Sequence, residues 1–157
     1  MKTLIIVRHS KTEKYAKSDI ERKLTDRGRN DAAVIGEKLK AATVQPEIIL
    51  CSPAKRARKT ARLLARHADY SNEIIVEDMA LYTEDACEII RLIRSLENFT
   101  KTLIVVGHNP VLLEIVNILS KRGIGNLRTS GVVKMQFDVN DWADISETTC
   151  SKLQELN

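Results

Sequence analysis

Residues 3–10 read Thr-Leu-Ile-Ile-Val-Arg-His-Ser, an apolar run that stops at a cation and a histidine. A run in which apolar residues follow one another without polar alternation is typical of a strand buried on both faces, as in the parallel sheets of α/β proteins. We therefore predict a central strand over Thr3–Val7. Ligands of such sheets bind at the carboxyl ends of the strands, which makes Arg8 and His9 candidate site residues by position alone.

Beyond this strand, apolar runs alternate with segments of helical periodicity. The other predicted strands cover Glu47–Cys51, Glu73–Val76, Thr102–Val106 and Val132–Val139, with one more short strand near the C-terminus. The predicted helices follow Thr25, run from Pro53 to about His67, cover Glu84–Leu96, and run from Pro110 to about Lys121. This order predicts an α/β fold, a three-layer sandwich with a mostly parallel central sheet and helices on both faces.

Two of the helix starts carry the same signal, a cap-forming residue followed by proline: Ser52-Pro53 and Asn109-Pro110. Serine and asparagine favour the N-cap, and proline favours the first helical position. Both pairs directly follow a predicted strand. We therefore expect the free amide groups and positive dipole ends of these two helices to point into one crevice.

The composition, with 43% hydrophobic and 29% charged residues, fits a single globular domain over residues 1–157. The apolar run before Arg8 is too short for a membrane span or for the core of a signal peptide. The three cysteines are widely spaced and form no Cys-x-x-Cys pair, which argues against a disulfide framework or a zinc site. We expect a cytoplasmic monomer that does not associate with membranes.

The net charge of +4 is unevenly distributed along the chain. Residues 1–70 hold 17 Lys and Arg against 8 Asp and Glu, whereas residues 71–157 hold 8 against 13. A basic N-terminal half suits an anionic partner. Nucleic acid is not expected, because aromatic residues make up only 4% of the chain and no nucleic-acid-binding module is recognisable.

Chemically active side chains follow three of the predicted strands. Arg8 and His9 end the first strand, Arg56 lies shortly after the second, and His108 follows the fourth. A neutral imidazole is a competent nucleophile, and neighbouring cations favour its neutral form. Arginine forks match pairs of phosphate oxygens, and a second histidine can donate to another oxygen. The set therefore predicts phosphoryl-group chemistry without a metal or cofactor.

At these residues the chain resembles the histidine phosphatase superfamily and, within it, the short phosphohistidine phosphatases of the SixA type. The likeness covers nearly the whole chain. The matching segments are Arg8-His9, Arg22-Lys23-Leu24-Thr25 with Arg27-Gly28 and Asp31-Ala32, Ser52-Pro53-Ala54-Lys55-Arg56-Ala57 with Thr60-Ala61, Val106-Gly107-His108-Asn109-Pro110, and Leu127 with Thr129-Ser130-Gly131.

The resemblance implies a phosphoglycerate mutase-like fold and a phosphatase that forms a phosphohistidine intermediate on His9. The implied catalytic residues are His9, Arg8, Arg56 and His108, and the implied substrate-binding residues are Ser10, Arg22 and Asn109. The implied substrate is a protein phosphorylated on histidine. The alternatives are a phosphatase of small phosphorylated metabolites and a non-catalytic relative that binds phosphate or another anion.

Two features depart from the family pattern. Ser10 stands where the superfamily usually has glycine, which reaches positive φ at no cost whereas serine does not. Larger members also carry an acidic proton donor on a long insertion between the Ser-Pro motif and the second histidine. This interval is short here, and Glu84 and Asp85 are the only nearby acids. We interpret both as first-turn residues of a helix. A site without a dedicated acid suits a phosphohistidine substrate, because imidazole can leave with its other nitrogen already protonated.

One rival mechanism uses a cysteine. Cys51 also ends a predicted strand before a basic segment, but a Cys-x5-Arg loop would need arginine at position 57, where the chain has alanine. We therefore interpret Cys51 as a buried strand residue, and we place His67 outside the site, near the end of its helix.

Overall fold

A single mixed β-sheet organises the computed structural model, which describes residues 1–157. Its strands lie in the order β3-β2-β4-β1-β5-β6. Their bounds are β1 Lys2–Arg8, β2 Ile48–Cys51, β3 Ile75–Glu77, β4 Thr102–Gly107, β5 Val132–Phe137 and β6 Cys150–Glu155. The first four strands pair in parallel, whereas β5 runs antiparallel to β1 and β6 antiparallel to β5. The predicted α/β fold, with a mostly parallel sheet, is confirmed.

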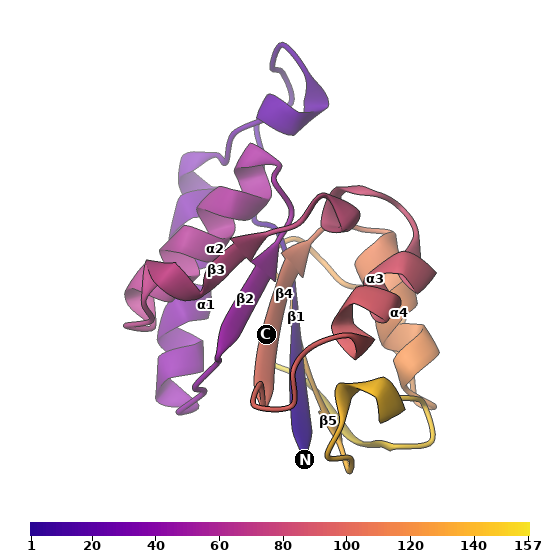
Figure 1. Ribbon diagram of the computed structural model, residues 1–157. Helices are drawn as coiled ribbons and strands as arrows, with labels where there is room; N and C mark the ends of the chain where they lie inside the picture. The colour runs from indigo at the N-terminus through magenta and orange to yellow at the C-terminus, as the bar shows by residue number, and fades with distance from the viewer.

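Helices cover both faces of the sheet, as Figure 1 shows. Their bounds are α1 Asp26–Ala41, α2 Lys55–His67, α3 Ala86–Arg94 and α4 Val111–Leu119, with short 3-10 turns at Asp19–Glu21, Asn72–Ile74, Met79–Tyr82 and Trp142–Asp144. Helices α1 and α2 pack on one face and α3 and α4 on the other. None of the helices combines the length and the apolar character that a membrane-spanning segment requires.

The two faces of β1 explain its unbroken apolar sequence. Successive side chains of a strand point to opposite faces. Leu4 and Ile6 belong to the core under α3 and α4, whereas Ile5 and Val7 belong to the core under α1 and α2. All four are fully buried, so every residue of the run contributes to one of the two apolar layers.

Both proline-marked helix starts were placed too early by the sequence. Helix α2 begins at Lys55 with Ala54 as its N-cap, and the Ser52 hydroxyl accepts a hydrogen bond from the Ala54 amide at 3.2 Å in the loop before it. Helix α4 begins at Val111 with Pro110 as its N-cap and ends at Leu119. In each case three residues form a short loop between the end of the strand and the start of the helix.

Smaller differences lie at other element ends. A 3-10 turn over Asn72–Ile74 replaces the first two residues of the strand predicted over Glu73–Val76, so β3 starts at Ile75. Strand β5 ends at Phe137 rather than at residue 139. The terminal strand β6 is confirmed. Thr25 caps α1 as predicted, with its hydroxyl accepting from the Gly28 amide at 3.0 Å.

Candidate active site

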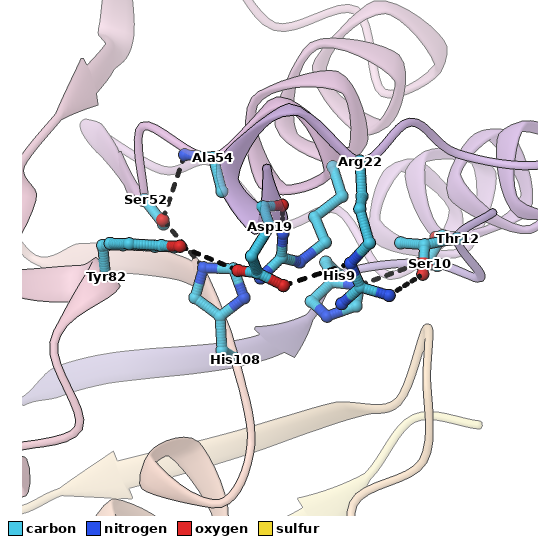
Figure 2. A network of polar contacts seen from close by, with 10 residues as sticks. His9, Ser10, Thr12, Asp19, Arg22, Ser52, Ala54, Tyr82 and His108 are labelled. Carbon is cyan, nitrogen blue, oxygen red and sulfur yellow. Dashed lines mark hydrogen bonds and ion pairs between the residues drawn. The ribbon is translucent and has the colours of Figure 1, made fainter. Parts of the chain in front are cut away.

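A cavity of about 740 Å³ lies at the carboxyl ends of β1 and β4, where parallel strands place their following residues. Thirteen residues line it: Arg8, His9, Thr12, Asp19, Arg22, Arg56, Tyr82, Thr83, Glu84, His108, Asn109, Val111 and Thr129. Five separate segments of the chain therefore meet around one polar hollow, and Figure 2 shows the central residues.

His9 offers one ring nitrogen to the cavity. Its Nδ1 lies 2.8 Å from the carbonyl oxygen of Ser10, and because a carbonyl only accepts, Nδ1 carries the proton. The lone pair of the neutral ring is therefore on Nε2. Burial is the main cause that lowers the pKa of His9 to about 4; the charges of Arg56, Arg8 and Arg22 act in the same direction, and the hydrogen bond to the Ser10 carbonyl opposes them. The ring is thus neutral and nucleophilic near pH 7.

His108 lies beside His9, with the two ring centroids 5.2 Å apart. Its Nε2 is 2.8 Å from the Ser52 hydroxyl oxygen, and its Nδ1 is buried without a partner. Figure 2 places this second nitrogen on the side of the ring that faces His9. Burial, followed by the charge of Arg56, lowers the pKa of His108 to about 3, so this ring is also neutral.

The hydrogen bonds of Ser52 select the tautomer of His108. The Ser52 oxygen already accepts from the Ala54 amide, and the residue is fully buried. If the hydroxyl donates to Nε2, every polar atom of Ser52 is satisfied; if Nε2 donates instead, the hydroxyl hydrogen is stranded in the interior. The first arrangement leaves the proton on Nδ1, where it can be donated into the cavity.

Arg8 and Arg56 bring two guanidinium groups to the cavity. Arg8 donates from its Nη1 to the carbonyl oxygen of Leu127 at 3.1 Å, while Arg56 is 5% exposed. The buried Nε of each arginine has no hydrogen-bond partner. Their donors are therefore only partly satisfied by the protein, as expected of groups that hold an anion.

Asp19 contacts several cavity cations at once. Its carboxylate accepts from Arg56 Nη2 at 2.9 Å, from Arg22 Nε at 3.1 Å and from the Tyr82 hydroxyl at 2.7 Å, and its carbonyl oxygen accepts from Arg56 Nη1 at 2.6 Å. The hydrogen bond from Tyr82 and those from the arginines lower the pKa of Asp19 to about 2. Asp19 is therefore ionised and acts as an internal counter-ion rather than as a proton donor.

The other predicted substrate-binding residues have different positions. Arg22 lines the cavity and donates to the Thr12 hydroxyl at 3.1 Å. Asn109 also lines it, but its amide group donates to Leu127 at 2.7 Å and accepts from Leu113. Leu127 thereby fixes both Asn109 and Arg8.

Ser10 lies behind the cavity rather than on its wall. It is fully buried, its amide donates to the Thr60 hydroxyl at 3.1 Å, and its hydroxyl accepts from Ser130 at 2.7 Å. The amide and the hydroxyl of Ser10 are thus both engaged within the protein, and the residue does not line the cavity as a substrate-binding residue would. The backbone at Ser10 does not adopt positive φ, so serine in place of glycine introduces no strain there.

The two candidate acids separate. Asp85 caps α3, its carboxylate accepting from the Glu88 amide at 3.2 Å, as the first-turn interpretation predicted. Glu84 instead precedes the helix and lines the cavity beside Tyr82 and Thr83.

Cys51 and His67 lie outside the cavity. Cys51 is fully buried, and burial raises the pKa of its thiol to about 11, the opposite of what a nucleophilic thiolate needs. His67 is at the end of α2, 3.8 Å from the Glu37 carboxylate of α1.

The sequence assigned no site role to Tyr82, Thr83 or Ser52. Tyr82 and Thr83 belong to an irregular stretch, and periodicity does not indicate where such a stretch folds. Ser52 did carry a signal, since it directly follows a strand whose carboxyl end faces the site. That signal was assigned instead to helix capping.

A family model matches the first half of the chain: the model of the histidine phosphatase superfamily (branch 1) matches residues 4–81. The chain belongs to this superfamily. The matched segment contains most of the first strand, the nucleophile candidate His9 and the arginine segment around Arg56. An uncharacterized protein of Mycobacterium leprae is 28% identical over 109 residues, which are 69% of this chain and 65% of that protein. The chain thus spans about two thirds of the length of this relative.

Solved structures of the superfamily share the fold. The protein histidine phosphatase SixA, complexed with tungstate, superposes with a TM-score of 0.84 at 22% identity, over 98% of this chain and 97% of that one. A mycobacterial glucosyl-3-phosphoglycerate phosphatase, complexed with VO3, gives a TM-score of 0.73 at 15% identity, over 99% and 97%. At these identities the likeness establishes the phosphoglycerate mutase-like architecture expected from the sequence.

Proposed function

We propose that this superfamily member is a metal-independent phosphatase that acts on protein phosphohistidine through a phosphorylated His9. Superfamily membership and the SixA-like fold support a phosphatase. The observation that carries the mechanism is the hydrogen bond from His9 Nδ1 to Ser10, which leaves the Nε2 lone pair free in a cavity bordered by arginines.

In the first step, His9 Nε2 attacks phosphorus in line with the leaving group. A P–N bond to the enzyme forms while the bond to the substrate breaks, and the leaving group takes the electron pair. Arg8, Arg56 and the Nδ1–H of His108 hold the equatorial oxygens, whose charge grows in the transition state. In the second step, water attacks phosphorus, the bond to His9 breaks, and inorganic phosphate is released.

A phosphohistidine substrate fits the acid–base groups of this cavity. Asp19 stays ionised, and both cavity histidines are neutral, so none of them is a strong proton donor near pH 7. An imidazole leaving group needs little help, since its other nitrogen is protonated before the bond breaks. An alkoxide, in contrast, needs a proton as it leaves.

The test is intact-mass analysis after brief exposure to phosphoramidate, comparing the wild type with His9→Ala. We expect an acid-labile, alkali-stable phosphate adduct on the wild type alone, together with phosphate release that the variant lacks. EDTA should leave the rate unchanged. Absence of both adduct and phosphate release would contradict the proposal and favour a non-catalytic anion-binding relative.

Glu84 supports a second candidate function, the hydrolysis of small phosphorylated metabolites. Its side chain lines the cavity, where a protonated carboxyl could supply the proton that an alkoxide needs. Strong turnover of phosphoglycerate that is lost in Glu84→Gln would favour this function. Phosphoramidate turnover that is unchanged in Glu84→Gln would favour the phosphohistidine substrate.

A further inference from the structure

A second hollow, of about 270 Å³, lies outside the catalytic cavity between α2 and the residues around the start of α1. Its lining contains six cations, one apolar residue and no acid: Lys23, Leu24, Arg29, Lys55, Arg58, Lys59 and Arg62. We call these residues the basic groove. The proposed phosphatase mechanism uses none of them.

Most of this charge is uncompensated. Arg29 pairs with Asp26, and Arg58 lies 3.7 Å from Glu77. The side chains of Lys23, Lys55, Lys59 and Arg62 make no ion pair or hydrogen bond, and all four are exposed. The groove therefore has free donors available to an anionic partner.

Helix α2 keeps this charge at a cost to its own stability. Lys55, Lys59, Arg62 and Arg66 recur at helical spacing on one exposed face, and the helix contains no acidic residue. Like charges three or four residues apart destabilise a helix by about 0.2–0.5 kcal/mol per pair. Cations in the first turn also oppose the helix dipole. A charge pattern that destabilises its own helix is typical of functional surfaces.

The basic groove adjoins the catalytic cavity. Lys55 belongs to the groove and the next residue, Arg56, to the cavity; Arg22 belongs to the cavity and the next residue, Lys23, to the groove. A large substrate whose phosphoryl group occupies the cavity can therefore also contact the basic groove.

We propose that the basic groove docks an acidic protein surface next to the phosphorylated histidine of the substrate. This inference rests on the proposed function and specifies the partner: a phosphoprotein whose aspartate and glutamate side chains flank its phosphohistidine. The groove volume suits a few carboxylate side chains. No aromatic residue lines it, whereas single-stranded nucleic-acid sites combine cations with aromatic stacking platforms.

The experiment compares two phosphohistidine peptides of equal length, one flanked by aspartates and one by serines, with wild type and with Lys59→Glu/Arg62→Glu. We expect the wild type to favour the aspartate peptide in kcat/KM. The variant should lose about tenfold on that peptide through KM, and retain its rates on the serine peptide and on phosphoramidate. The wild-type preference should shrink as the salt concentration rises from about 0.02 M to about 0.3 M.

Lys121→Glu/Arg122→Glu is the matched control. It makes the same change in net charge just after α4, a helix that leads away from the carboxyl ends of the parallel strands (Figure 1). Neither residue lines the cavity or the groove. This variant should keep the peptide preference. An equal loss in both variants would show a general charge effect and overturn the proposal, as would equal kcat/KM values of the wild type for the two peptides.

Binding separates this inference from the proposed function. Fluorescence anisotropy with the unphosphorylated aspartate peptide reports docking even if the protein lacks phosphatase activity. Binding that is lost in Lys59→Glu/Arg62→Glu supports the groove in either case, and no binding with normal phosphoramidate turnover overturns the groove alone. Tighter binding of an oligothymidylate than of the peptide would also overturn it, in favour of nucleic acid.

Discussion

His9 and His108 adjoin the same cavity, but their hydrogen bonds give them opposite chemistry. The Nδ1–H of His9 donates to a carbonyl oxygen, which leaves a lone pair at Nε2. A hydroxyl group at Nε2 of His108 leaves a proton at Nδ1. A nucleophile and a hydrogen-bond donor can therefore be made from one residue type by changing only the partner atom.

Replacing Ser52 tests the tautomer of His108. In Ser52→Ala we expect the Nδ1–H form to lose its preference, which lowers kcat on phosphoramidate about tenfold with little change in KM, since a misplaced donor acts mainly on the transition state. His108→Ala should cost more, roughly 10²–10³ in kcat. Nitrogen-15 NMR of the imidazole reports the tautomer directly. An unchanged His108 spectrum in Ser52→Ala would contradict this assignment.

At this scale the sequence indicated which residues gather but not which atoms they present. Strand ends predicted the positions of His9 and His108 because parallel strands end at one edge of the sheet. The contacts of Ser10 and Ser52 depend on the path of the loops after those strands, which no periodicity encodes. The hydrogen bond from Tyr82 to Asp19 joins residues 63 apart in the chain, and no local pattern indicates such a contact.

Among the elements, strands were easier to predict than helix starts. A strand buried on both faces, such as β1, is recognisable from its composition alone. The proline at each misplaced helix start signals only that the residue before it is extended. A short loop separates each strand from the helix that follows it. In these loops Ser52 and Asn109 make their contacts at the site.

Helices α1 and α2 approach closely at Gly36. A Cβ built there would overlap the carbonyl oxygen of Leu64 and lie 2.8 Å from the Cβ of His67. Gly36→Ala should therefore lower the free energy of unfolding by about 1–3 kcal/mol through overpacking, although alanine favours an isolated helix. Urea denaturation measures the change. As a control, Gly125→Ala meets no atom within 4 Å and should change stability little.

At the scale of the whole molecule, the fold keeps His9 and His108 neutral in an environment rich in cations. Burial comes first and the arginines second in lowering the pKa values of His9 and His108, whereas sequence reasoning emphasised the arginines. Composition and charge could predict that the chain binds an anion. They could not predict how deeply each histidine is buried, because burial follows from the packing of loops over the sheet.

Stability should therefore fall as the pH decreases. The unfolded histidines titrate near 6.5, but the folded ones titrate at about 4 and about 3, so the unfolded state binds more protons between these values. The free energy of unfolding should drop from pH 6.5 to pH 4. Urea denaturation across this range should give a flatter dependence in His9→Ala/His108→Ala. An equal pH dependence in the variant and the wild type would refute the neutral-histidine description.

The carboxylate of Asp19 gives the resting protein a built-in competitor. Asp19 pairs with Arg56 and Arg22 before any ligand binds. An incoming phosphoryl group therefore has to displace this carboxylate instead of binding to unpaired arginines. This displacement lowers the binding free energy of every external anion by the same amount. Free orthophosphate makes contacts only inside the cavity, so it loses most of its affinity. A large phosphorylated molecule also makes contacts outside the cavity and keeps their binding energy. The cavity can thus stay available in a phosphate-rich solution and empty itself after turnover.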